Sequence, residues 1–174
     1  MRLLLIESTP GNAREINDRL TAAGHEVVMC ADAHGPCRGV THHEDCPIEH
    51  HTDLTLVARE AGTSRSLDEM GSVCSARHHI PVVELDPRDP DAVRDLPVTH
   101  ALASRAVRAA YANAVRSEVP EAEVTIERSP DLVHVTLRVP PGTNVSAVAD
   151  RARKVVREHD PYVRGIDVSV VTAD

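Results

Sequence analysis

Aromatic side chains are almost absent from this sequence: its 174 residues include no Trp, no Phe and only two Tyr. A core must therefore be built from Val, Leu, Ile and Ala, which favour parallel strands covered by helices. The same absence argues against single-stranded nucleic acid as a ligand, because proteins that bind it stack its bases on aromatic side chains. We expect an α/β protein without a nucleic-acid partner.

Long hydrophobic runs are missing as well. The first apolar run, residues 3–6, is far shorter than the core of a secretory signal. No stretch approaches the roughly 20 apolar residues that a membrane span requires. We therefore predict a cytoplasmic protein with no membrane span. In that compartment its four cysteines are expected as thiols or metal ligands rather than as structural disulfides.

The surplus of negative charge lies in the first half of the chain. Net charge is −8; residues 1–99 hold 17 acidic and 9 basic side chains, and residues 100–174 hold 10 of each. The acidic half should repel nucleic acid and anionic membranes at long range. The neutral half contains one basic cluster, which we interpret as a charged helix face. It consists of Arg151, Arg153, Lys154 and Arg157.

Short apolar runs alternating with helical periodicity predict a parallel α/β domain over residues 1–95. Strands are expected at residues 2–6, 26–29, 54–57 and 80–85, with a helix that ends near residue 23 and another at 66–76. Residues 31–52 should hold a second crossover helix, but glycine and proline are frequent there. We expect an irregular segment with at most a short helical turn.

The second half predicts a separate α+β module of order αββαβ over residues 100–174. Helices are expected at 101–118 and 145–159, and strands at 122–127, 132–139 and 166–171. Within 132–139, apolar residues alternate with polar ones, which is typical of a half-buried antiparallel strand. Three prolines between residues 86 and 98 predict a linker or a weak last strand between the two halves.

The first half resembles a response-regulator receiver domain in the segments LLLIES, GHEVVMC, TDLTLVARE and HHIPVVELD. The resemblance implies a flavodoxin-like parallel sheet in receiver order. A receiver accepts phosphate on an aspartate that ends its third strand, beside an acidic pair after the first strand. Here the acceptor position falls on Ala58, the acidic pair is reduced to Glu7, and the position of the receiver's Ser or Thr falls near Asp86. The resemblance therefore implies a pseudo-receiver that lacks both the nucleophile and a Mg²⁺ site.

The C-terminal segments SPDLVHVTLRVPPGTNVSAVADRARKVV and IDVSVVTAD resemble the alkaline-shock general stress protein family. That family shows the same strand, tight turn, amphipathic helix and valine-alternating strand. Its members are implicated in stress and in envelope-associated scaffolding, and not in catalysis. The resemblance implies a stress-response role through protein contacts.

Cysteine and histidine are concentrated between His25 and His79, where all four cysteines and eight of the eleven histidines fall. One motif occurs twice: residues 46–51 and 74–79 both have the pattern C-x3-H-H, and each precedes a predicted strand. Because these strands are neighbours in receiver order, ~4.8 Å apart, both motifs should lie at the same edge of the sheet.

Two thiolates and two imidazoles at one edge would suit a tetrahedral Zn²⁺ ion. The candidate ligands are Cys46, His50, His51, Cys74, His78 and His79. Cys30 follows the second predicted strand, so we expect it at the opposite edge, away from Cys74. The alternative to zinc binding is that Cys30 and Cys37 form a redox pair of thiols. The remaining alternative is that the cysteines are buried and serve only to fill the core.

No glycine-rich phosphate loop and no G-x-S-x-G elbow occurs in the sequence. We therefore predict a non-enzymatic regulatory or adaptor protein that acts through protein contacts and is not phosphorylated. The alternative is a metal- or redox-sensing protein that uses the Cys/His-rich segment 30–79. The sequence names no partner, and a homodimer is one arrangement that it leaves open.

Overall fold

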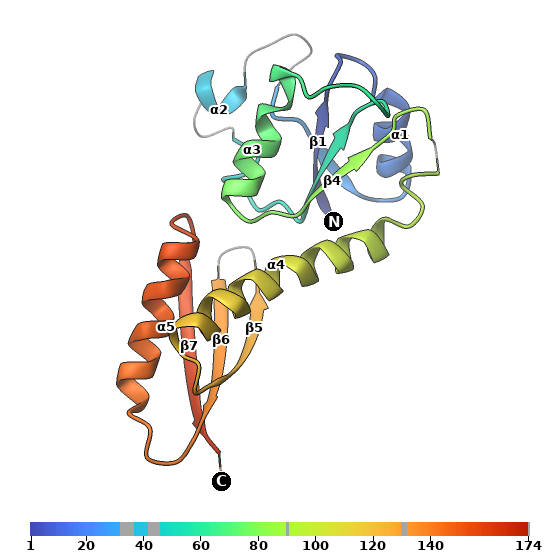
Figure 1. Cartoon of the computed structure of the whole chain (residues 1–174). Coiled ribbons are helices and arrows are strands. Elements are labelled where there is room, and N and C mark those ends of the chain that lie inside the picture. Colours follow the sequence, from blue (N-terminus) through green and yellow to red (C-terminus); the bar gives the residue numbers. More distant parts are fainter. Residues whose placement is uncertain (32–36, 42–45, 90, 130–131, 174) are drawn as a thin grey trace. The chain divides into compact units, whose positions relative to one another are not determined.

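The structure, a computed structural model, describes residues 1–31, 37–41, 46–89, 91–129 and 132–173. Two compact units make up the chain, Met1–Ser104 and Arg105–Asp174 (Figure 1). The first contains a four-stranded parallel sheet, and the second contains a separate three-stranded mixed sheet. The protein is therefore of the α/β class with an additional smaller sheet.

The boundary between the units lies inside a long helix, α4 (Leu96–Glu118). This helix begins earlier than the predicted start at residue 101, although Pro97 is its second residue. The first-turn amides of a helix have no intrahelical acceptor, so a proline there removes no hydrogen bond. Pro97 therefore belongs to the start of α4 and does not interrupt the chain.

The sheet of the first unit has the order β2-β1-β3-β4. Its strands are β1 (Arg2–Glu7), β2 (Glu26–Val28), β3 (Leu54–Ala58) and β4 (Val82–Leu85). All neighbouring strands are parallel. The two central strands, β1 and β3, have apolar side chains buried on both faces. Burial on both faces explains why their sequences are uninterrupted apolar runs rather than alternating ones.

Helices cover both faces of this sheet (Figure 1). On one face, α1 (Arg14–Ala22) buries Ile16 and Leu20 against Leu3, Leu5 and Leu56. The other face packs against α3 (Met70–Arg77) and the 3-10 turn before it, η2 (Leu67–Glu69). The short helical turn that the prediction allowed within residues 31–52 is α2 (Arg38–Thr41). The irregular course predicted for residues 32–36 and 42–45 lies outside the described residues.

Gly71 lets α3 approach the sheet closely. A Cβ at this position would lie 2.7 Å from Cys30 Sγ and 2.9 Å from Ile6 Cδ1, closer than real Cβ atoms come to other atoms. The helix thus packs on β1 and on the end of β2 through a residue without a side chain. Contacts with Cys30 therefore come from the same helix that carries Cys74.

The second unit confirms the predicted order αββαβ. It is built from the C-terminal part of α4, β5 (Glu123–Arg128), β6 (Leu132–Val139), α5 (Val145–His159) and β7 (Gly165–Thr172). The alternation predicted for β6 is also confirmed, since Val133, Val135, Leu137 and Val139 are all buried. β6 is antiparallel to β5 but parallel to β7, because α5 returns the chain to the same end of the sheet.

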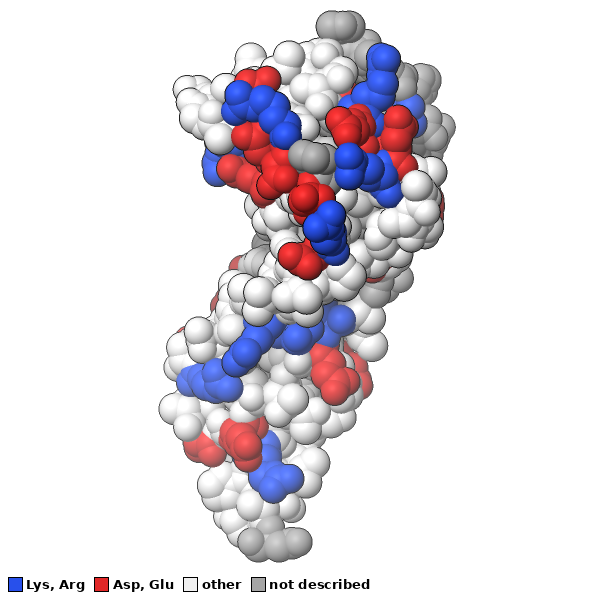
Figure 2. All heavy atoms as spheres, turned by 90° about the vertical axis from the view of Figure 1, so that its right-hand side faces the viewer, with Lys and Arg blue, Asp and Glu red and all other residues white. Residues whose placement is uncertain are grey.

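The basic cluster of α5 is a charged helix face, as predicted. All four side chains are exposed, and each has an acceptor within the unit. Arg151 pairs with Glu121, Arg153 with Asp150 at 3.0 Å and Lys154 with Glu158 at 3.8 Å, while Arg157 donates to the Val163 carbonyl at 2.5 Å. Charges of both signs are likewise interspersed over the first unit in Figure 2. Within the described part of the chain, no helix is long and apolar enough to cross a membrane.

Candidate functional site

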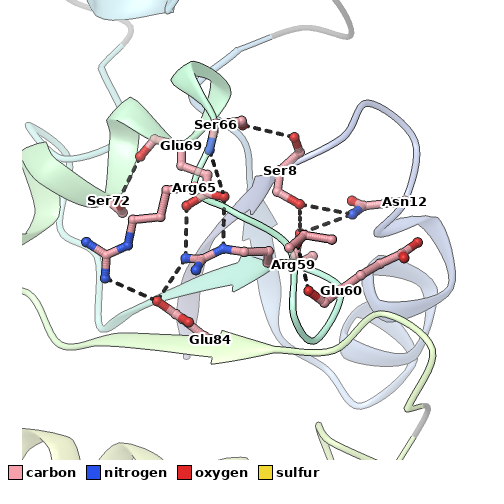
Figure 3. Close-up of polar contacts among 11 residues, drawn as sticks. Ser8, Asn12, Arg59, Glu60, Arg65, Ser66, Glu69, Ser72 and Glu84 are labelled. Atoms are coloured by element: carbon pink, nitrogen blue, oxygen red, sulfur yellow. Dashed lines mark hydrogen bonds and ion pairs between the residues drawn. The ribbon is translucent and has the colours of Figure 1, made fainter.

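The carboxyl ends of the parallel strands are where sheets of this kind place their ligand sites. At this edge Ala58, the last residue of β3, is fully buried. Its carbonyl accepts hydrogen bonds from Ser8 N (3.1 Å), Ser8 Oγ (2.8 Å) and Asn12 Nδ2 (3.1 Å) (Figure 3). A methyl group therefore stands at the position where the receiver resemblance places the acceptor carboxylate.

Glu7, the acid that ends β1, is engaged by the chain itself. Its carboxylate accepts hydrogen bonds from the backbone N–H groups of Gly11 (2.9 Å) and Ala13 (3.2 Å). These amides precede or begin α1, whose N-cap has no side-chain hydrogen bond. Glu7 therefore supplies the acceptor that the start of the helix needs. Its oxygens hold the loop between β1 and α1.

A group of ion pairs occupies the same edge, centred on Arg59 (Figure 3). The Arg59 guanidinium binds Glu69 with two hydrogen bonds, Nε to Oε1 at 3.0 Å and Nη2 to Oε2 at 2.9 Å, and donates to Glu84 Oε1 at 2.8 Å. Arg65 adds a weaker contact with Glu84 at 3.4 Å. We call Arg59, Glu69 and Glu84 the edge triad. It joins the end of β3 to η2 and to β4.

Burial distinguishes the Arg59–Glu69 pair from the other contacts of the edge triad. The Glu69 side chain is 3% exposed and that of Arg59 is 12% exposed, so little water screens the pair. Glu69 also accepts from Ser66 N in a capping box, and Ser66 Oγ donates to the Ser8 carbonyl at 3.0 Å. The pair therefore ties η2 to the ends of both central strands.

Asp86 lies at the end of β4, where the resemblance places the receiver's Ser or Thr. Its carboxylate accepts hydrogen bonds from the backbone N–H groups of Ala61 (3.1 Å) and Arg88 (2.9 Å) and from the Arg88 side chain. The Arg88 guanidinium is the largest cause that lowers the pKa of Asp86 to about 2. Asp86 is thus an anionic anchor for its own loop.

The four cysteines gather on the α3 face of the sheet. Cys30 is 8% exposed, and Cys37, Cys46 and Cys74 are half-buried against the same apolar cluster. All four are free thiols. We call these residues the thiol cluster. Cys30 follows β2, Cys37 and Cys46 lie before and after α2, and Cys74 belongs to α3.

Burial is the main cause that raises the pKa of the Cys30 thiol to about 11, and the neighbouring Cys37, Cys74 and Cys46 contribute in the same direction. Burial also raises the pKa of Cys74, again with Cys37 and Cys46 as neighbours. The expectation that Cys30 lies away from Cys74 is therefore wrong. Cys74 lies in the middle of α3, which packs along the sheet face instead of staying at one edge.

The predicted zinc ligands are only partly brought together. Cys46 and Cys74 share the thiol cluster, but His51 pairs with Asp53 at 2.9 Å, Nε2 to Oδ1. His51 and His79 have positive φ angles, 26° and 52°; His79 closes the end of α3 and His51 precedes β3. Within the described ranges, no three His, Cys, Asp or Glu side chains are placed where they could hold a metal ion. Zinc binding by the two C-x3-H-H motifs stays a prediction.

Sequence reasoning missed two features of these sites. It did not pair Arg59 with Glu69 and Glu84, because nothing in the local pattern marks residues 10 and 25 positions apart as partners. It also split the cysteines between two edges of the sheet. The concentration of all four cysteines within residues 30–74 was the available signal. Comparison with models of known protein families and with curated proteins finds no match to this chain.

Proposed function

We propose that this protein is a non-enzymatic regulatory or adaptor protein that acts through protein contacts and is not phosphorylated. The observation that carries the proposal is the edge triad beside Ala58. The edge that would accept phosphate in a receiver has no carboxylate at the acceptor position, and its neighbouring acids are bound by Arg59, Arg88 and backbone amides. This arrangement favours a protein-binding surface that is always present over one that phosphorylation switches on or off.

The strand order supports the pseudo-receiver part of the proposal. The order β2-β1-β3-β4 corresponds to the first four strands of the flavodoxin-like order 2-1-3-4-5. The resemblance to receivers, which the sequence segments suggested, is compatible with this parallel arrangement. The resemblance of the second unit to the alkaline-shock family likewise remains part of the proposal and directs it toward scaffolding and stress response.

An apolar stripe supports protein contact as the mode of action. Leu67, Met70 and Val73 are 87%, 53% and 42% exposed. They follow one another at intervals of three residues along η2 and α3, so they lie along one side of these turns. Large apolar side chains exposed together mark surfaces that other proteins bind. We define these three residues as the α3 stripe.

The absence of phosphorylation is testable with acetyl phosphate and Mg²⁺. We expect the intact mass of the protein to be unchanged, because Ala58 provides no nucleophile and the nearby carboxylates are engaged by the chain. A phosphorylatable receiver treated in parallel is the positive control. Phosphate that maps to Asp53 or Glu60 would overturn the claim of an inactive acceptor site.

The contact surface is testable by site-specific photocrosslinking in cells. A photoreactive residue in place of Leu67 should give a discrete covalent adduct, because this position is the most exposed of the α3 stripe. The matched control places it at Asp18, an exposed position on α1, which covers the opposite face of the sheet. Introducing Met70→Glu into the protein that carries the photoreactive residue at position 67 should weaken this adduct. An adduct of twice the chain mass would identify the partner as a second copy. Equal adducts from both positions, or none from position 67, would contradict the proposal.

A further inference from the structure

We propose that Cys37 and Cys46 form a reversible disulfide, which makes the thiol cluster a redox-responsive modification site. The inference does not depend on the adaptor function. It starts from the positions of the two sulfurs and from the different environments of the four thiols.

Geometry places the Cys37 and Cys46 sulfurs beside the same residue of α2. A Cβ built on Gly39 would lie 3.3 Å from Cys46 Sγ and 3.6 Å from Cys37 Sγ. Both sulfurs thus border one small space on the helix, and Gly39 leaves that space open. Eight residues separate the two cysteines along the chain. Both sulfurs lie close to one point, so rotation of the two cysteine side chains is the movement that a disulfide requires.

The other two cysteines have thiols whose pKa is raised by burial. Cys30 is 8% exposed and its pKa is raised to about 11, so very little thiolate forms at neutral pH. Burial raises the pKa of Cys74 as well. Gly71 also packs directly on Cys30, so the Cys30 sulfur lies between α3 and the sheet. Cys37 and Cys46 are half-buried, one before α2 and the other after it.

The chemistry requires a small-molecule disulfide as the oxidant, for example oxidised glutathione. One thiolate of the pair attacks a sulfur of this disulfide, whose S–S bond breaks and releases one glutathione thiolate. The second cysteine, as its thiolate, then attacks the protein sulfur of the mixed disulfide and releases the other glutathione thiolate. The two protein thiols lose two electrons and two protons in total, and one glutathione disulfide becomes two glutathione thiols. The product joins the two flanks of α2.

The test equilibrates the full-length protein in glutathione buffers of graded potential, blocks free thiols with N-ethylmaleimide and measures intact mass and peptide maps. We expect two of the four cysteines to become unreactive together and the peptide map to join Cys37 to Cys46. Cys37→Ser and Cys46→Ser should each abolish the disulfide and leave a glutathione adduct on the remaining partner. Cys74→Ala and Cys30→Ala should retain it, and Cys74→Ala keeps the test valid if the more buried Cys30 variant does not fold.

Three results would overturn the proposal. The first is a disulfide between Cys30 and Cys37, the pair considered from the sequence. The second is glutathione adducts without any protein disulfide at every potential tested. The third is protein purified without added metal that contains stoichiometric zinc and reacts with N-ethylmaleimide only after chelation, which would make the cluster a metal centre.

Discussion

Arg59→Ala is expected to lower the free energy of unfolding of the first unit by about 3–5 kcal/mol, the usual cost of removing one partner of a buried ion pair. The loss is large because Glu69, 3% exposed, would keep a buried charge without the guanidinium that binds it twice. Glu84 is more exposed and would be solvated instead. The edge triad should therefore act mainly through Glu69.

Two further variants show whether burial is the reason. Arg65→Ala removes an arginine that contacts the same Glu84 but is 78% exposed, so it should change stability by no more than about 0.5 kcal/mol. The double variant Arg59→Leu with Glu69→Leu should recover most of the loss, because apolar side chains replace buried ion pairs at little cost. If Arg59→Ala costs no more than Arg65→Ala, the edge triad does not hold the sheet edge.

The composition of the chain allows each unit to be followed separately during urea unfolding. All four cysteines lie in Met1–Ser104, and both tyrosines lie in Arg105–Asp174. Thiol reactivity therefore reports on the first unit and tyrosine fluorescence on the second. The Arg59 variants should shift the thiol transition and leave the tyrosine transition in place.

Tyr111→Phe is expected to destabilise the second unit by about 1.5–3 kcal/mol, the range for a hydrogen bond to a charged group. The Tyr111 hydroxyl donates to Asp160 Oδ2 at 2.5 Å, and both residues are at most 1% exposed. The bond ties α4 to the turn that follows α5, where Asp160 also accepts from Tyr162 N at 3.0 Å. Tyrosine fluorescence from Tyr162 still reports unfolding in this variant. Tyr162→Phe, at a side chain 51% exposed, is the control and should have little effect.

The same contact predicts how stability depends on pH. Burial, followed by the hydrogen bond to Asp160, raises the pKa of Tyr111 above its ordinary value of 10. The unfolded chain therefore loses this proton at a lower pH than the folded unit does, so stability falls as pH rises above 10. Tyr111→Phe should show a smaller decline in the same range. An equal decline in both proteins would mean that Tyr111 does not cause it.

Elements defined by local pattern were predicted well. The helix α5 (Val145–His159) has the predicted bounds, and the alternating residues of β6 are buried as expected. The apolar runs of β1 and β3 were found because both faces of these strands are covered. In each case, residues close in sequence report directly on which sides of the element are buried.

Elements that depend on exceptions to local rules were predicted less well. Pro97 suggested an interruption, but the first turn of α4 accepts it. The α3 helix was expected, yet its close approach to Cys30 through Gly71 was not, because a glycine inside a helix does not reveal what packs against it. The sheet position of Cys74 was misjudged for the same reason.

The sequence by itself determined that residue 58 is an alanine and carries no carboxylate, that β6 has one buried face and that four cysteines fall within one stretch of 45 residues. Only the tertiary structure decided that Arg59 binds Glu69 and Glu84 and that Cys37 and Cys46 share the space beside Gly39. Local patterns follow from which side of each element is buried. Contacts between distant residues depend instead on where each crossover helix packs on the sheet, and this is set by the whole first unit folding around the two faces of its sheet.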